Sequence, residues 1–207
     1  MMRLEIGLFF CEFIEVNGKL KIKEFIMFIV IEGIHDTGKT TLINKICEKS
    51  NYLLYEGKRL FPELANVNNV SISDFSTGGN CAITWFAKNF SDKADIIFDR
   101  LHLSEYAYSK LFRNVNEIVA MNRFRMINDK LSTYNVKMIY LYCNYETLIS
   151  RSKQRNTLVY NEEHHKKLTE YYENLIKNTS MANCCIDTGK FNEVEVYDKV
   201  LQFLKGE

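Results

Sequence analysis

Residues 33–40 carry the clearest chemical pattern in the chain. They read Gly33-Ile-His-Asp-Thr-Gly38-Lys39-Thr40 and fit the phosphate-loop pattern G-x-x-x-x-G-K-[ST]. An apolar run of strand length comes before the loop, and apolar residues at helical spacing follow it. In that setting, backbone N–H groups and the helix dipole bind phosphate oxygens. The sequence therefore predicts a nucleotide-binding loop.

The individual residues of the loop have distinct expected tasks. Lys39 is expected to face solvent in the empty site and to reach the β- and γ-phosphates of a bound nucleotide, while the Thr40 hydroxyl ligates Mg²⁺. The two glycines let the chain turn and let an anion approach the backbone closely. The expected nucleotide-binding residues are Gly33, His35, Asp36, Thr37, Gly38, Lys39, Thr40 and Thr41.

A second charged pair, Asp99-Arg100, ends the apolar run of residues 94–98. In open parallel sheets, ligands bind outside the carboxyl ends of the strands, where the glycine loop also lies. Asp99 can hold Mg²⁺ or its water, and Arg100 can grip a phosphate through two hydrogen bonds. The alternative is a surface Asp–Arg pair at a strand end.

Arg151, Lys153 and Arg155 alternate with polar residues and predict a mobile cationic lid near residues 151–160. Such a lid closes over the transferred group and excludes water. The alternative is a solvated helix end, where the helix dipole favours arginine.

The elements that must position these residues alternate between strand and helix, which predicts a three-layer α/β sandwich. Its sheet is expected to be mostly parallel and five-stranded, with helices on both faces. The expected strands span 25–32, 52–55, 94–99, 136–143 and 183–188. The expected helices span 39–50, 81–90, 145–152, 162–177 and 191–204, and residues 104–131 are expected to form a long helical region.

Residues 1–26 read differently from the rest of the chain. Alternating sequence on both sides of Asn17-Gly18 predicts a β-hairpin. We therefore expect an N-terminal extension over 1–26 and a catalytic domain over 27–207; a mobile extension is the alternative for the first part.

Whole-chain properties exclude several classes of partner. A net charge of +1 gives no electrostatic basis for binding nucleic acid. The apolar runs are shorter than the ~20 residues that span a bilayer, and residues 5–14 lack the features of a signal peptide. The six cysteines show no Cys-x-x-Cys spacing, which indicates free thiols in a reducing cytoplasm.

Several of these segments together resemble one family. Asp99-Arg100-Leu-His-Leu-Ser104-Glu-Tyr-Ala-Tyr108 resembles the thymidylate kinase pattern Asp-Arg-Tyr-x-x-Ser-x-x-Ala-Tyr. Residues 32–41 are similar to the phosphate loop of that family, and Arg59-Leu-Phe61-Pro-Glu to its substrate-side segment. Residues 151–155 with the following helix, which carries Tyr171 and Tyr172, resemble its lid, and residues 185–188 resemble its adenine-side strand end. The resemblance covers residues 27–204.

The resemblance implies a P-loop kinase fold and a mononucleotide kinase that moves the γ-phosphoryl group of ATP to a deoxynucleoside monophosphate, dTMP first, with Mg²⁺. It also implies a homodimer formed through residues 104–131. The implied catalytic residues are Lys39, Asp99, Arg100, Arg151 and Arg155, with Thr40 and Asp99 at the metal. The implied substrate-binding residues are His35, Arg59, Phe61, Arg100, Ser104, Glu105 and Tyr108.

Three departures from the family pattern leave the base specificity open. His35 stands where the family usually carries an acid, Leu101 stands where it carries Tyr, and Trp85 and Phe86 are the candidates for the base-stacking aromatic.

Two other functions remain open from the sequence. One is a deoxynucleoside kinase acting on a 5′-hydroxyl, which needs a general base such as Glu56. The other is a nucleotide-binding module without transfer. No Asn-Lys-x-Asp tetrapeptide occurs, which argues against a switch GTPase.

Overall fold

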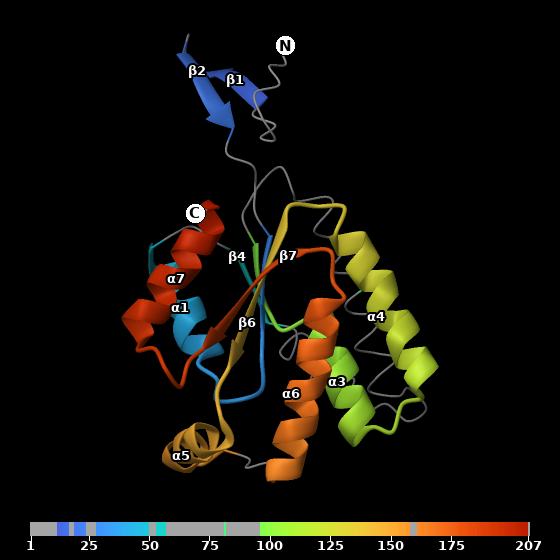
Figure 1. Cartoon of the computed structure of the whole chain (residues 1–207). Helices are drawn as coiled ribbons and strands as arrows, with labels where there is room; N and C mark the ends of the chain where they lie inside the picture. Colours follow the sequence, from blue (N-terminus) through green and yellow to red (C-terminus); the bar gives the residue numbers. More distant parts are fainter. Residues whose placement is uncertain are drawn as a thin grey trace.

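The computed structural model describes residues 12–16, 19–23, 28–49, 53–56, 81, 96–157 and 161–206 (Figure 1). Along the chain, the elements are β1 (Glu12–Val16), β2 (Lys19–Lys23), β3 (Phe28–Glu32), α1 (Lys39–Lys49), β4 (Leu53–Glu56), β5 (Ile96–Asp99), α3 (His102–Phe112), α4 (Glu117–Leu131), β6 (Val136–Tyr142), α5 (Tyr145–Arg155), α6 (Glu162–Lys177), β7 (Ala182–Asp187) and α7 (Glu193–Lys205). From β3 onward, the described strands are interspersed with single helices, α1 and α7, and with two helix pairs, α3–α4 and α5–α6.

The main sheet has the strand order β4-β5-β3-β6-β7, and each neighbouring pair is parallel. β3 is buried along its whole length and lies between β5 and β6. In the pairing register, Ile31 is opposite Asp99 and Glu32 is opposite Tyr140. The carboxyl ends of these three parallel strands therefore lie side by side at one end of the sheet. The glycine loop begins there.

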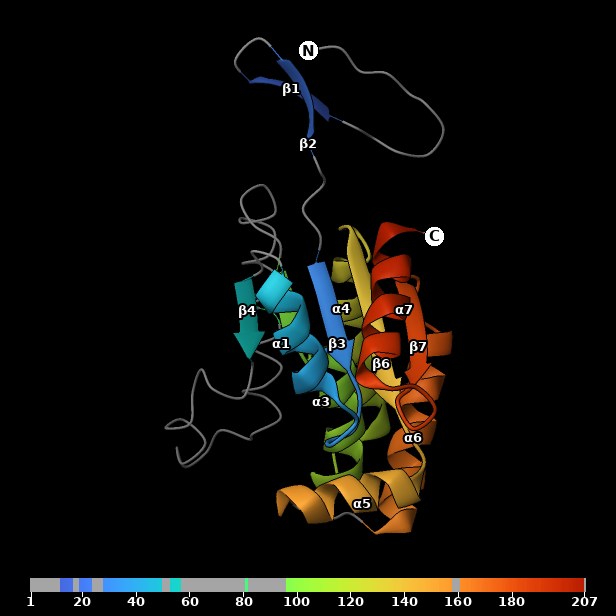
Figure 2. The same ribbon diagram turned by 90° about the vertical axis from the view of Figure 1, so that its left-hand side faces the viewer.

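Alternate residues of β3 point to opposite faces of the sheet because side chains in a strand alternate with period two. Phe28 and Val30 pack in a core with residues of α3, α4 and α6. Ile29 and Ile31 pack in a second core with residues of α1 and α7. Figures 1 and 2 show the two helical layers on either side of the sheet and α5 beyond the carboxyl ends of the strands. The predicted α/β class with a covered parallel sheet is confirmed.

The long helical region predicted over residues 104–131 is divided into two helices, α3 and α4. Between them, Asn114 has a left-handed backbone with φ 49°. The Asn116 side chain then accepts a hydrogen bond from the N–H of Ile118 and caps α4. Two asparagines with strong local preferences thus end one helix and start the next.

Several sequence predictions fall wholly or partly outside the described residues. β1 and β2 pair antiparallel, with Val16 opposite Lys19, but Asn17-Gly18 itself lies outside them. The predicted helix after Cys81 also lies outside the described residues. So do four site candidates, Arg59, Phe61, Trp85 and Phe86.

Within the part of the chain that the structure describes, no helix combines the length and apolar character needed to cross a bilayer. The described cysteines are all free: Cys47, Cys81, Cys143, Cys184 and Cys185.

Candidate active site

The glycine loop leaves β3 at Gly33 and enters α1 at Lys39. Gly33 has φ 145°, and a Cβ there would lie 2.2 Å from the carbonyl oxygen of Leu141. Only glycine therefore allows the loop to pack against β6. Gly38 has φ 90°, and a Cβ there would meet nothing within 4 Å. The space above Gly38 is thus open to a ligand, as a phosphate cradle requires.

Lys39 does not face solvent, so that expectation was wrong. Its side chain is buried, and Nζ donates a 2.6 Å hydrogen bond to the carbonyl oxygen of Ile34 within the loop. Thr37 Oγ1 donates to the same oxygen at 2.8 Å. The physical reason is that a lysine ammonium beside a loop seeks an acceptor, and a loop carbonyl supplies one where phosphate oxygens are absent.

Asp99 and Thr40 carry the donor set expected for a magnesium ion. Asp99 Oδ1 is buried and has no hydrogen-bond partner among the described residues, and Thr40 is exposed at the first turn of α1. The described chain contains no cluster of three or more His, Cys, Asp or Glu side chains that could hold a metal. Mg²⁺ needs no such cluster, because phosphate and water oxygens complete its shell in nucleotide sites. The residues present therefore fit Mg²⁺.

Arg100 lies where β5 ends, beside the loop strand. Its backbone is left-handed, with φ 67°, and its N–H donates to the carbonyl oxygen of Ile31 at 3.0 Å. The guanidinium lies over the Tyr108 ring, and Nη1 donates to the Tyr108 hydroxyl at 3.3 Å. Burial opposes the charge, but Tyr108, Tyr172 and Glu32 more than compensate and raise the pKa of Arg100. Arg100 is therefore a permanent cation.

Glu32 is the site residue that the sequence analysis did not single out. Its carboxylate is fully buried. One oxygen accepts from the backbone N–H groups of Leu101, Leu103 and Ser104, and the other accepts from the Ser104 hydroxyl. Burial raises the pKa of Glu32, while these hydrogen bonds and Arg100 act in the opposite direction. A charged residue at the end of an otherwise apolar strand was the signal that could have identified it.

Ser104 and Glu105 of α3, which the resemblance assigns to the substrate, make different contacts. Ser104 Oγ lies 2.7 Å from the Tyr172 hydroxyl of α6, in addition to its bond with Glu32. Glu105 forms a 3.0 Å ion pair with Arg113. Ser104 therefore joins α3 to Glu32 of β3 and to Tyr172 of α6. The Glu105 carboxylate is paired with Arg113.

His35 lies on the loop and contacts its neighbour Asp36. Its Nδ1 is 2.9 Å from Asp36 Oδ2. Burial lowers the pKa of His35, and the charges of Arg100 and Lys39 lower it further against the opposing effect of Asp36. The His35 ring is thus influenced by the charges of both Lys39 and Arg100.

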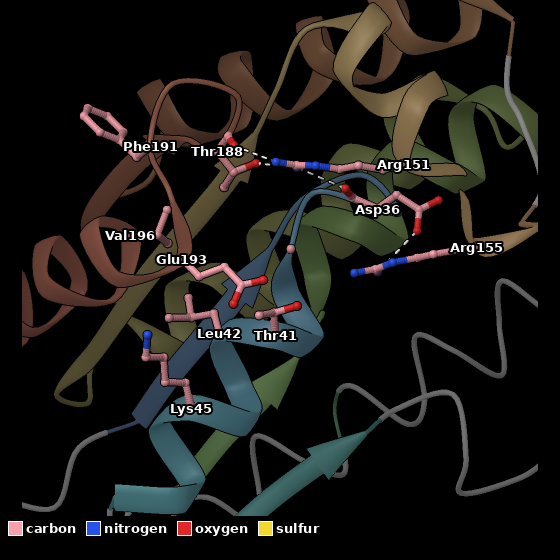
Figure 3. Close-up of a pocket in the computed structure, with 11 residues that line it drawn as sticks. Asp36, Thr41, Leu42, Lys45, Arg151, Arg155, Thr188, Phe191, Glu193 and Val196 are labelled. Atoms are coloured by element: carbon pink, nitrogen blue, oxygen red, sulfur yellow. Dashed lines mark hydrogen bonds and ion pairs between the residues drawn. The ribbon is translucent and has the colours of Figure 1, made fainter. Parts of the chain in front are cut away.

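Asp36 connects the loop to α5, the predicted lid helix (Figure 3). Its Oδ2 accepts hydrogen bonds from Ser152 Oγ at 2.8 Å and Thr157 Oγ1 at 2.6 Å, and Oδ1 lies 3.5 Å from Arg155. Burial acts to raise the pKa of Asp36, but the hydrogen bonds from Thr157, Ser152 and His35 lower it overall. The lid helix therefore lies against the loop in this structure.

Arg151 makes a different contact from the one expected of a phosphoryl clamp. Its Nη2 donates to the Thr188 carbonyl at 2.6 Å, and Nη1 donates to Thr188 Oγ1 at 2.9 Å and to the Asp36 carbonyl at 3.3 Å. Arg151 thus joins α5 to the turn after β7 and to the loop. A pocket lies between these segments, α1 and the start of α7 (Figure 3), with Phe191 and Val196 on its apolar side.

Comparison with known proteins gives one sequence relative and many similar structures. No family model matches the chain. A protein described as "Probable thymidylate kinase" from Methanocaldococcus jannaschii is 26% identical over 190 residues, which cover 86% of this chain and 96% of that protein.

Two solved structures illustrate the structural matches. Deoxyadenosine kinase from M. mycoides with bound dATP has a TM-score of 0.62 at 21% identity, covering 86% of this chain and 100% of that one. Thymidylate kinase from Candida albicans has a TM-score of 0.59 at 14% identity, covering 88% and 92%. The chain therefore shares the P-loop kinase fold of these two structures.

The P-loop kinase fold accounts for the arrangement of the site. The loop after β3 and the Asp99-Arg100 pair after β5 lie on adjacent parallel strands, and α5 lies beyond their ends. The family resemblance inferred from the sequence is confirmed. The same matches include kinases named for two kinds of acceptor, a nucleoside monophosphate and a nucleoside.

Proposed function

We propose that the protein transfers the γ-phosphoryl group of ATP to a deoxynucleoside monophosphate, with dTMP as the preferred acceptor. The observation that carries this proposal is Arg100. It is a permanent cation at the carboxyl end of β5, next to the loop strand, and among the described residues no carboxylate pairs with it. A cation that keeps hydrogen-bonding capacity beside a phosphate loop suits an acceptor that itself carries a phosphate.

Phosphoryl transfer depends on positioning and on cations around the moving group rather than on covalent chemistry by the protein. In this proposal Lys39 leaves the Ile34 carbonyl and binds the donor phosphates, and Arg100 binds the acceptor phosphate. Thr40 and Asp99 hold Mg²⁺, which neutralises charge on the donor phosphates. A monophosphate presents an ionised oxygen, so no general base is required.

Arg155 is the lid residue best placed to approach the transferred group in this proposal. Its only ion pair among the described residues is the 3.5 Å contact with Asp36, and half of its side chain is exposed. Arg151, which binds Thr188 and the loop backbone, serves the donor-base side. A bound triphosphate competes with Asp36 for Arg155.

A specific observation favours a second function, a deoxynucleoside kinase. Glu56 is the last residue of β4 and is opposite Asp99 in the pairing register. The backbone therefore brings an acid to the same sheet edge as Asp99 and Arg100. Such an acid is what phosphorylation of a 5′-hydroxyl requires. The similarity to a deoxyadenosine kinase structure is consistent with this alternative.

The deciding experiment supplies the purified chain with Mg-ATP and, separately, with dTMP, thymidine, and other deoxynucleosides and their monophosphates. Formation of dTDP is expected. Turnover of nucleosides alone would establish the second function, and ATP binding without transfer to any acceptor would establish a binding module. Arg100→Ala is expected to raise the acceptor KM by about 100-fold, because the phosphate loses a bidentate cation. Arg125→Ala, which removes an exposed arginine on α4, is the matched control.

The proposal includes the organisation of the whole chain. Residues 27–207 form the kinase domain around a five-stranded sheet, with a lid near 151–160, and residues 1–26 form a β-hairpin extension. The free thiols suit a reducing cytoplasm. Ile118 and Met126 of α4 are exposed apolar residues within the region expected to form a homodimer. Light scattering of the wild type and of Ile118→Lys tests the dimer.

A further inference from the structure

Helix α3 begins without a cap of its own. Leu101 occupies the N-cap position, and no side chain of the helix itself accepts a hydrogen bond there. The first N–H groups of any helix lack partners within the helix and need acceptors from elsewhere. Here the acceptor is Glu32 Oε1, which receives the N–H groups of Leu101 at 2.9 Å, Leu103 at 3.2 Å and Ser104 at 3.3 Å.

The second oxygen of Glu32 extends this contact to another helix. It accepts from the Ser104 hydroxyl, and Ser104 Oγ lies 2.7 Å from the Tyr172 hydroxyl. The Tyr172 ring is fully buried and stacks on Tyr140 of β6. One fully buried carboxylate therefore joins the end of β3 to the start of α3 and, through Ser104, to α6.

The positions of these residues in the chain give the contact its significance. Glu32 immediately precedes Gly33, the first residue of the loop, and Leu101 immediately follows Arg100. A separate backbone bond, from the Arg100 N–H to the Ile31 carbonyl at 3.0 Å, joins the same two segments. The Glu32 side chain thus spans the distance between the donor-phosphate loop and the residues that face the acceptor. In-line transfer is sensitive to that distance, since a displacement of about 1 Å can cost about 100-fold in rate.

We propose that Glu32 is a positioning residue, whose reach sets the place of Arg100 and Ser104 relative to the phosphate loop. This inference rests on the proposed kinase function. Glu32 touches neither substrate, because its side chain is fully buried and its oxygens are occupied by Leu101, Leu103 and Ser104. Its contribution is to hold these segments at a fixed separation. Two substitutions distinguish the effect of side-chain length from the effect of charge.

Glu32→Asp keeps the charge but shortens the side chain by one methylene, so the carboxylate cannot meet both the α3 N–H groups and Ser104. We expect kcat to fall by about 100-fold while the affinity for Mg-ATP, measured by calorimetry, stays within about threefold. Glu32→Gln keeps the length, since its oxygen accepts from the N–H groups and its amide donates to Ser104. Its kcat is expected to stay within about threefold of the wild type.

Glu163→Asp and Glu163→Gln are the matched controls, because this glutamate pairs only with Lys167 on the exposed face of α6 and should show no effect. The opposite order, with Glu32→Gln inactive and Glu32→Asp active, would show that charge matters and would overturn the inference. Equal activity of Glu32→Asp and the wild type would overturn it too.

If Glu32→Asp does not fold, Ser104→Ala decides the matter by removing the hydroxyl that joins Glu32 to Tyr172, while the backbone N–H bonds to Glu32 remain. Its kcat is expected to fall by about tenfold with unchanged Mg-ATP affinity, and unchanged kcat overturns the inference. The wild type is measured first. A wild type that binds Mg-ATP but phosphorylates no acceptor would overturn the proposed function and this inference with it, whereas an active wild type with the wrong variant order would overturn only the inference.

Discussion

Two carboxylates four positions apart, Glu32 and Asp36, connect the phosphate loop to the rest of the molecule in different ways. Glu32 is fully buried and accepts three backbone N–H groups of α3 and one hydroxyl. Asp36 accepts the side-chain hydroxyls of Ser152 and Thr157 and lies 3.5 Å from Arg155. One acid binds the start of α3, the proposed acceptor side, and the other binds α5, the proposed lid.

The difference lies in what each contact needs in order to break. The N–H groups bound by Glu32 belong to the backbone at the start of α3 and have no partner within the helix. Breaking this contact therefore leaves buried N–H groups without an acceptor. The hydroxyls bound by Asp36 can leave by side-chain rotation alone, and the Arg155 side chain is half exposed. The contact between Glu32 and the start of α3 is therefore part of the framework, whereas α5 can separate from the loop, as the proposed lid movement requires.

The largest expected effect comes from Glu32→Leu, which replaces the buried carboxylate with an apolar side chain of similar size. The N–H groups of Leu101, Leu103 and Ser104 then lack an acceptor. We expect the free energy of unfolding to fall by about 3–5 kcal/mol. Urea unfolding followed by circular dichroism measures it. A loss as small as that of Asp36→Ala would remove the distinction between framework and lid.

Asp36→Ala should loosen the lid while leaving the framework in place. The amides of α5 are expected to exchange with deuterium about tenfold faster in the ligand-free protein, because a local opening needs about 1.4 kcal/mol less. Amides of α3 should exchange at the wild-type rate. Hydrogen exchange read by mass spectrometry gives both values. Faster exchange in α3 would mean that the two regions open together.

Thr188→Val tests the third contact of the lid helix, that of Arg151. It removes the hydroxyl that accepts from Nη1 at 2.9 Å but keeps the carbonyl that accepts from Nη2. The same hydroxyl donates to the Tyr142 carbonyl at 3.2 Å, so the variant loses two hydrogen bonds. A loss of about 1–3 kcal/mol in unfolding free energy is therefore expected. Thr133→Val, which removes an exposed hydroxyl in the turn after α4, is the control. A loss as large as that of Glu32→Leu would place Arg151 in the framework.

The smallest expected effect is the pH dependence of stability, and its sign differs between the two acids. Burial raises the pKa of Glu32 above 4.5, so its folded form retains a proton longer and stability falls as pH rises from 4.5 through the folded pKa. For Asp36, burial is outweighed by the hydrogen bonds from Thr157 and Ser152, and its pKa drops below 3.8. Its contribution to stability is therefore lost as pH falls below 3.8. Urea unfolding of the wild type against Glu32→Gln and Asp36→Asn measures both slopes, and slopes of one sign would contradict the comparison.

The sequence predicted the elements whose causes are local. The boundaries of α6 match the prediction, since Asn161 caps a strongly amphipathic stretch. The buried strand β3 followed from its run of apolar residues, and the loop followed from glycines whose positive φ no other residue adopts easily. Helix α3 could not be separated from α4, because the break depends on the left-handed backbone of Asn114 and the cap of Asn116 within a continuous helical pattern.

By itself, the sequence determined the chemistry available to this protein: a phosphate loop, an Asp-Arg pair at a strand end and arginines in a lid segment. Only the tertiary structure decided how that chemistry is held. Glu32 meets the N–H of Leu101 across 69 residues of chain, and Arg151 meets Asp36 across 115. Such partners have no periodicity or spacing to reveal them, because they exist only once parallel strands bring their ends to one edge of the sheet. Even Lys39, the most recognisable residue of the loop, turned inward to the Ile34 carbonyl, since a buried ammonium takes the nearest acceptor that the folded loop provides.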